Sequence, residues 1–211
     1  DVLLHGRLQR QAYGADDGAV SLWRDVEPLM ADADVTYANL EGATAPGVDN
    51  RGRAVDDPGR VFDDHVYSSY PMFNYHPSVL DSLKASGVDV VSTANNHSLD
   101  RRELGVRRTL DELQQRNIAA TGTRRSADGD ETWWSITETD GFRLAWLACT
   151  YATNGIPDND NQVLYCYRQR DTVVRTVRQL ADRDDIDAVI VTPHWGQQYT
   201  SNPRDRQVDF A

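Results

Sequence analysis

Short apolar runs that alternate with helical patterns are the feature of this sequence that most restricts its fold. The runs 35–38, 88–93 and 186–192 are rich in β-branched residues, which is typical of strands in a covered sheet. Segments 77–85 and 103–116 carry apolar side chains at helical spacing. Strands that alternate with helices predict βαβ units, in which helices cover both faces of a largely parallel sheet.

An antiparallel portion is expected beside this sheet. The dipeptide Asp140-Gly141 separates two strand-like segments, 133–139 and 142–149, and is the residue pair that a type I′ hairpin turn prefers. Residues 186–192 are predicted to form a buried strand because of their apolar composition.

The remaining segments give further expectations. Residues 21–30 predict a helix with Ser21 as its N-cap, and residues 172–183 predict the most regular helix of the chain. A short strand is expected at residues 118–120. The stretch 42–70 is rich in Gly, Asp and Arg and predicts a long loop, a kind of segment that is usually functional or disordered.

Side chains that can coordinate a metal follow three of the predicted strands. Glu41 comes shortly after the first, Asn96 and His97 follow the second, and His194 ends the third. Because parallel strands bring their carboxyl ends to one edge of a sheet, these side chains are expected to converge there. A carboxylate, an amide oxygen and imidazoles form a ligand set that suits Mn, Fe or Zn. Asp1, at the edge of the first strand-like run, is a further candidate.

Each of these residues also has an ordinary structural interpretation. An Asn after a strand is usually a turn residue, a lone His is more often hydrogen-bonded structure than a ligand, and Glu41 could be a solvated loop carboxylate. Asp100 could cap the helix that begins near Glu103. Three strand ends that each carry a coordinating group nevertheless favour a functional site.

The charge balance excludes some partners. The chain of 211 residues, long enough for one domain with a sizeable core, has 33 acidic against 22 basic residues and a net charge of -11. Nucleic acid or an anionic membrane would be repelled by such a surface. The excess fits either solubility or an acidic pocket for cations.

The two cysteines and the chain ends do not decide in which cellular compartment the protein acts. Cys149 and Cys166 are too few for a disulfide scaffold, although one bridge between them is possible. The sequence has neither an apolar run of membrane-spanning length nor a secretory signal. Both ends look cut, so targeting or anchoring segments are expected outside residues 1–211.

Four segments together resemble a known family. They are NLEG, LDSLKASGVDVVSTANNHSLD, GVRRTLDEL and VIVTPHWGQQY, which occur in this order along nearly the whole chain. They resemble the CapA family of poly-γ-glutamate capsule biosynthesis proteins, within the calcineurin-like metallophosphoesterase superfamily. The resemblance implies an α/β fold, a four-layer αββα sandwich formed by one CapA-like domain over residues 1–211, with a site for two divalent metal ions (Mn, Fe or Zn).

The resemblance also implies roles for individual residues. Asp1 matches the Asp of the family's first motif, and Glu41 matches the acidic ligand expected to bridge the metals, with Asn39 beside it. Asn96 and His194 match further metal ligands.

His97 matches the catalytic His of the family, and Asp100 could orient its ring. Departures from the superfamily pattern are Leu3 at the place of a His and Glu41 at the place of an Asp. The family's C-terminal Gly-His-His-Pro-His-like segment has no counterpart, so the sandwich is expected to be C-terminally truncated and its metal site incomplete.

Three functions follow from the residues and the resemblance. The first is a two-metal hydrolase of the phosphoester type that acts in capsule (poly-γ-glutamate) biosynthesis. The second is a non-catalytic component that binds the anionic polyglutamate polymer or assembles with other capsule biosynthesis proteins. The third is cleavage of a γ-glutamyl amide bond with the same metals. A place in the cell envelope or outside the cell is expected, with membrane contact only through segments that are not in this chain.

Two groups of side chains bear on substrate binding. A polymer-binding protein of net charge -11 would need a local basic patch, and a solvated helix face is the alternative for part of it. The candidates for the patch are Arg51, Arg53, Arg60, Arg101, Arg102, Arg107 and Arg108. A dense aromatic stretch, for which core packing is favoured over a substrate platform, comprises Tyr67, Tyr70, Phe73 and Tyr75.

Overall fold

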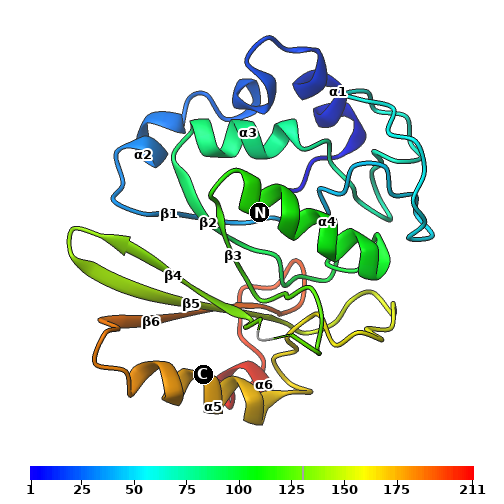
Figure 1. Cartoon of the computed structure of the whole chain (residues 1–211). Helices are drawn as coiled ribbons and strands as arrows, with labels where there is room; N and C mark the ends of the chain where they lie inside the picture. The colour runs from blue at the N-terminus through cyan, green and yellow to red at the C-terminus, as the bar shows by residue number, and fades with distance from the viewer. Residues whose placement is uncertain (130) are drawn as a thin grey trace.

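The computed structural model describes residues 1–129 and 131–211, and its helices and strands form four layers (Figure 1). Helices cover the outer face of each of two three-stranded sheets, and the sheets lie between them. The helices over the first sheet are α1 (Gly6–Gly14), α3 (Ser78–Ala85) and α4 (Arg102–Gln115), and those over the second are α5 (Arg170–Ala181) and α6 (Asp205–Val208). The expected αββα sandwich is confirmed.

The first sheet is parallel, with strand order β1-β2-β3. Its strands are β1 (Thr36–Asn39), β2 (Val88–Ser92) and β3 (Ala119–Thr121). The central strand β2 is almost completely buried because a helical layer and the second sheet cover its two faces. The strand-like run that follows Asp1 forms one isolated parallel bridge, in which Val2 pairs with Leu40.

The second sheet has the order β4-β5-β6 and mixed directions. Its strands are β4 (Trp134–Thr139), β5 (Phe142–Thr150) and β6 (Ala188–His194). β4 and β5 form the predicted hairpin, and both turn residues have the positive φ of a type I′ turn, 47° at Asp140 and 81° at Gly141. β6 pairs parallel to β5.

The predicted burial of the last strand is wrong. β6 is half-buried along most of its length, because it is the edge strand of its sheet among the described residues. The apolar residues of β6 indicate that one face of the strand packs against α5. They do not indicate whether another strand pairs with its outer edge.

The predicted helix at residues 21–30 is also wrong. A 3₁₀ helix, η1 (Gly18–Leu22), ends before a short helix, α2 (Glu27–Ala31), begins with Pro28 in its first turn. Ser21 does not cap a helix, and its hydroxyl donates to the Gly18 carbonyl. Leu29, which the helical spacing placed on an apolar face, is 76% exposed.

The long loop 42–70 is confirmed and is wrapped around one buried arginine. Arg101 is fully buried and donates hydrogen bonds to the carbonyls of Val48, Val66 and Met72 and to the Ser68 hydroxyl. These bonds satisfy backbone groups that have no strand partner. The loop is therefore held against the start of α4.

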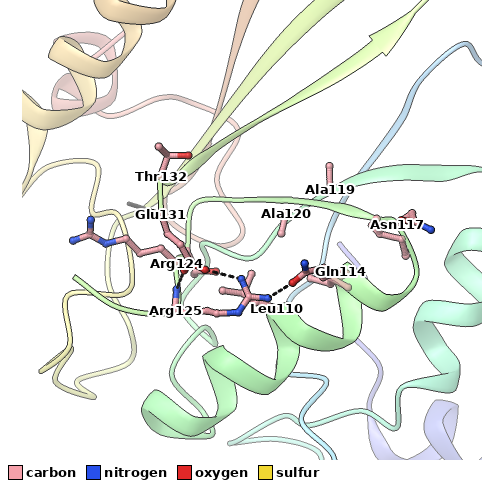
Figure 2. Close-up of a pocket in the computed structure, with 12 residues that line it drawn as sticks. Leu110, Gln114, Asn117, Ala119, Ala120, Arg124, Arg125, Glu131 and Thr132 are labelled. Atoms are coloured by element: carbon pink, nitrogen blue, oxygen red, sulfur yellow. Dashed lines mark hydrogen bonds and ion pairs between the residues drawn. The ribbon is translucent and has the colours of Figure 1, made fainter. Parts of the chain in front are cut away.

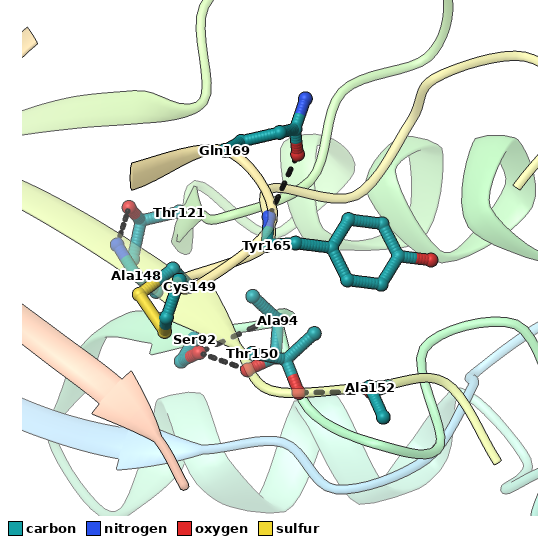
Figure 3. Close-up of a disulfide and its surroundings, with 10 residues drawn as sticks. Ser92, Ala94, Thr121, Ala148, Cys149, Thr150, Ala152, Tyr165 and Gln169 are labelled. Atoms are coloured by element: carbon teal, nitrogen blue, oxygen red, sulfur yellow. Dashed lines mark hydrogen bonds between the residues drawn. A yellow bond between two sulfur atoms is a disulfide. The ribbon is translucent and has the colours of Figure 1, made fainter. Parts of the chain in front are cut away.

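A disulfide joins the end of β5 to the segment before α5. Cys149 and Cys166, whose bridge the sequence left open, are bonded and fully buried (Figure 3). Next to them, Thr150 accepts the backbone N–H of Cys166, so the loop between them is closed at its base. Within the described residues, no helix combines the length and the apolar character that a membrane crossing requires.

Candidate metal centre

Three strand ends meet as the sequence predicts. The imidazole Nε2 of His194, at the end of β6, lies 2.8 Å from Oδ1 of Asn96, after β2, and 3.7 Å from Oε1 of Glu41, after β1. Asp1, Glu41 and His194 each offer a ligand atom, and these atoms lie within 4.8 Å of one another. The predicted convergence is confirmed, while the roles of these residues remain predictions.

The spacing of these donor atoms fits a coordination shell. Ligand atoms that each lie about 2.1 Å from a metal at angles of 90–110° are separated by roughly 3.0–3.4 Å. The two separations measured from His194 Nε2, 2.8 Å and 3.7 Å, bracket this range. Two carboxylates, an amide oxygen and an imidazole are also the donor types that divalent first-row metals accept.

The electrostatics of the cluster favour a bound cation as well. Burial lowers the pKa of His194 to about 4, so this imidazole is neutral at pH 7. Burial also raises the pKa of Glu41, whose Oε1 lies 3.7 Å from Nε2 of His194. A neutral ring does not offset a buried carboxylate charge, whereas a cation between the donors would.

Asn39 and Asn95 brace the donors. Asn39 donates from Nδ2 to the Asp1 carboxylate at 2.9 Å, and the same nitrogen lies 3.4 Å from Nδ1 of His194. Its oxygen accepts from Asn95, a fully buried residue that also donates to the Leu40 carbonyl. The role of Asn39 as a ligand stays a prediction, and in this structure its nitrogen faces the cluster while its oxygen accepts from Asn95.

His97 and Asp100 form a buried pair beside the donors. Nδ1 of His97 lies 2.8 Å from Oδ2 of Asp100, which also accepts the backbone N–H of Phe73. Since the carboxylate accepts from Nδ1, the other ring nitrogen is the one available for proton exchange. The interpretation of Asp100 as a helix cap is wrong, since α4 begins at Arg102 without a side-chain cap.

Much of the expected basic patch is engaged in the fold. Arg101 is buried in the long loop, and Arg53 binds the buried carboxylate of Asp49. Arg108 donates to two backbone carbonyls of the loop, and Arg107 pairs with Asp160 at 3.2 Å. Arg53 and Arg107 are thus ion-paired, whereas Arg101 and Arg108 are held by hydrogen bonds to neutral groups, so these four side chains serve the fold.

The aromatic stretch packs mainly in the core, as favoured. Tyr67, Phe73 and Tyr75 are buried, whereas Tyr70 is 74% exposed. The ring of His97 packs edge-on against Phe73, with their centroids 4.8 Å apart. The aromatic stretch therefore packs in the core next to His97.

A pocket of about 590 Å³ lies apart from the donor cluster, along α4 and β3 (Figure 2). The guanidinium of Arg125 in its wall pairs with Glu131, Asp111 and Gln114. Arg124 packs over the ring of Trp133. The Arg125 charge is thus ion-paired within the protein, and the Arg124 guanidinium also donates to the Asn161 carbonyl.

Sequence reasoning missed two residues at the cluster. Tyr151 stacks on the His194 ring, with centroids 6.3 Å apart, and Asn154 accepts a hydrogen bond from Asn96. The dipeptide Asn154-Gly155 is a turn signal that could have directed attention to this loop. Nothing in the sequence alone places the loop beside a strand end from the other sheet.

The sequence is similar to a described protein family and to curated proteins. A family model described as the bacterial capsule synthesis protein PGA_cap matches residues 1–211. The PGA biosynthesis protein CapA of Bacillus subtilis (strain 168) is 28% identical over 195 residues, which are 92% of this chain and 47% of that protein. The capsule biosynthesis protein CapA of Bacillus anthracis is 23% identical over 206 residues, covering 94% and 45%. The chain thus spans about half the length of the curated relatives it matches.

Similarity to solved structures covers part of the chain. The sulfate thiohydrolase SoxB of Thermus thermophilus covers 57% of this chain and 22% of its own, with 17% sequence identity and a TM-score of 0.37.

Proposed function

This chain belongs to the PGA_cap family of bacterial capsule synthesis proteins, and on that premise we propose that its donor cluster is the metal centre of a hydrolase in capsule polymer biosynthesis. The observation that carries the proposal is the meeting of Glu41, Asn96 and His194 from three separate strand ends, with the His97–Asp100 pair beside them. These donors, together with Asp1, would hold divalent metal ions, of which the proposal takes two; Asp1, Glu41 and His194 lie close enough to share one ion.

The reaction that this arrangement supports best is hydrolysis of a phosphoester. When bound, the cations supply Lewis-acid polarisation of the scissile group and an activated water. In its doubly protonated form, His97 donates the Nε2 proton to the leaving oxygen and becomes neutral, while the Asp100 carboxylate accepts from Nδ1 and orients the ring. Hydrolysis of a γ-glutamyl amide would use the same groups, and the assay below separates the two.

A non-catalytic role in polymer binding has less support. Polyglutamate is anionic, and a chain of net charge -11 would need an unpartnered basic surface to hold it. Arg53, Arg101, Arg107 and Arg108 are partnered within the protein. Binding of the polymer through the metal centre stays compatible with the hydrolase.

The cell envelope is the proposed place of action. The Cys149–Cys166 bridge supports this location, since disulfides persist in oxidising compartments. The names of the relatives, which refer to capsule and PGA biosynthesis, support the same place.

The proposal is tested by Mn²⁺ titration calorimetry together with assays on phosphodiester and γ-glutamyl amide substrates. Glu41→Gln is expected to abolish metal binding and turnover. His97→Gln is expected to keep metal binding and to lose about 10²–10⁴-fold in turnover, the usual contribution of a general acid. The exposed Glu138→Gln, on the β4 strand, serves as the matched control. Unchanged Mn²⁺ binding and turnover in both Glu41→Gln and Asn96→Ala would overturn the proposal.

A further inference from the structure

We propose that Asn154 is a positioning residue that fixes the amide of Asn96 with its oxygen toward the donor cluster. The inference rests on the proposed metal centre and assigns a role within it to a residue from the disulfide-closed loop. Nδ2 of Asn96 donates to Oδ1 of Asn154 at 3.3 Å. Oδ1 of Asn96 is thereby left facing Nε2 of His194 at 2.8 Å.

The orientation of this amide decides whether Asn96 can act as a ligand. An Asn side chain has an oxygen that accepts and a nitrogen that only donates, and the two ends have nearly the same shape. Only the oxygen end can coordinate a cation. A partner that accepts from the nitrogen end therefore selects the orientation that binds metal, as the outer partners of metal ligands commonly do.

The backbone around Asn154 is built to present this side chain. Asn154 and Gly155 both have positive φ, 50° and 77°, and Ile156 donates its backbone N–H to the Thr153 carbonyl across the turn. Asn tolerates this left-handed conformation better than most residues do. The hydroxyl of buried Thr153 donates to the Ile156 carbonyl and lies 3.0 Å from the Tyr165 hydroxyl, so the turn is fixed to the base of its loop.

The same loop, between Cys149 and Cys166, also contacts His194. Tyr151 donates its backbone N–H to the His194 carbonyl at 3.0 Å, and its ring stacks on the imidazole. The disulfide Cys149–Cys166 closes this loop one residue before Thr150, at the end of β5 (Figure 3). Asn96 and His194, which come from different sheets, are thus held in relation to each other by one closed loop.

Three variants distinguish the effect of the Asn154 side chain from that of the left-handed backbone. Asn154→Gly removes the amide and keeps the left-handed turn without strain, since Gly accepts positive φ. Asn154→Asp keeps an acceptor oxygen at the same place. Asn117→Gly replaces another exposed Asn of positive φ (53°), which follows α4 away from the cluster, and is the matched control.

Two measurements are made on each variant. In Mn²⁺ titrations, Asn154→Gly is expected to weaken binding about 10-fold, whereas Asn154→Asp and Asn117→Gly bind at least as tightly as the wild type. In metal-free NMR spectra, the side-chain amide resonances of Asn96 are expected to shift in Asn154→Gly and to stay near their wild-type positions in Asn117→Gly.

The outcomes for the inference and for the proposed function are distinct. A wild-type protein that does not bind Mn²⁺ defeats the metal centre, and the NMR measurement then decides the role of Asn154 by itself. Equal Mn²⁺ affinity of the wild type and Asn154→Gly overturns the inference and leaves the metal centre intact. Coincident Asn96 amide resonances in these two proteins overturn it as well.

Discussion

The strand ends that supply the cluster are stabilised in different ways. After β2, the segment 95–101 binds mostly to itself and to the loops around it, with Asn95 and Asp100 fully buried and His97 7% exposed. At the end of β6, the His194 side chain is 23% exposed and is positioned by Asn96 and Tyr151 from other segments.

This difference suggests distinct roles for the two strand ends of the site. The β2 end is preorganised by local hydrogen bonds, which suits a residue that must move a proton in a fixed geometry. The β6 end depends on tertiary contacts with a closed loop. Loss of the buried contacts at the β2 end should therefore lower the stability of the fold most, and changes around the β6 end should alter the position of the His194 ring more than that of the His97 ring.

The largest effect is expected from Arg101→Leu at the β2 end. The variant leaves the carbonyls of Val48, Val66 and Met72 buried without this donor and should lower the free energy of unfolding by about 3–5 kcal/mol. Urea denaturation measures the change. Arg107→Leu, which breaks a half-exposed ion pair, should cost less than about 1 kcal/mol. Equal losses in the two variants would contradict the central role of Arg101.

Removal of the disulfide tests the loop that supports the β6 end. The double variant Cys149→Ala/Cys166→Ala opens a link between residues 17 positions apart and should lower the free energy of unfolding by about 2–4 kcal/mol. Urea denaturation with and without reductant measures it. The wild type should respond to reductant and the double variant should not; a wild type that is indifferent to reductant would show that the bridge contributes no stability.

The pH dependence of stability should report His194. Its pKa is about 4 in the folded protein and has an ordinary value of 6.5 in the unfolded chain, because burial disfavours the charged ring. Between these values the unfolded chain binds a proton that the folded protein does not, so stability falls as pH decreases from about 6.5 to about 4. Metal-free His194→Gln should show a shallower fall over this window in denaturation curves. An identical slope in wild type and variant would mean that His194 is not buried as a neutral ring.

The smallest effect is expected from Tyr151→Leu. The loss of one half-exposed ring stacking should cost at most about 1 kcal/mol of unfolding free energy. The NMR signals of the His194 ring should shift, while those of the His97 ring should not. Shifts of similar size in both rings would show that the two strand ends are not positioned independently.

Part of the site could be predicted from the sequence, since it depends on local properties. The positions of Glu41, Asn96 and His194 after apolar runs follow from strand periodicity, and parallel pairing brings such positions to one edge. The hairpin at Asp140-Gly141 follows from the φ values that its turn requires.

Other parts could not be predicted because they depend on which distant segments meet. The exposure of Leu29 goes with the interruption of one helical pattern between η1 and α2, where residues 23–26 are not helical. The half-exposure of β6 depends on its place at the edge of a sheet, which composition does not encode. The roles of Arg101 and Asn154 appear only when their partners are in place.

The sequence by itself determined the alternation of strands and helices, the hairpin and the coordinating residues at the strand ends, because backbone preference and side-chain period act over a few neighbouring residues. The tertiary structure decided which arginine is buried, how the cysteines pair and which loop orients the Asn96 amide. These are contacts between segments far apart in the chain, and their energies exist only once the two sheets have packed together.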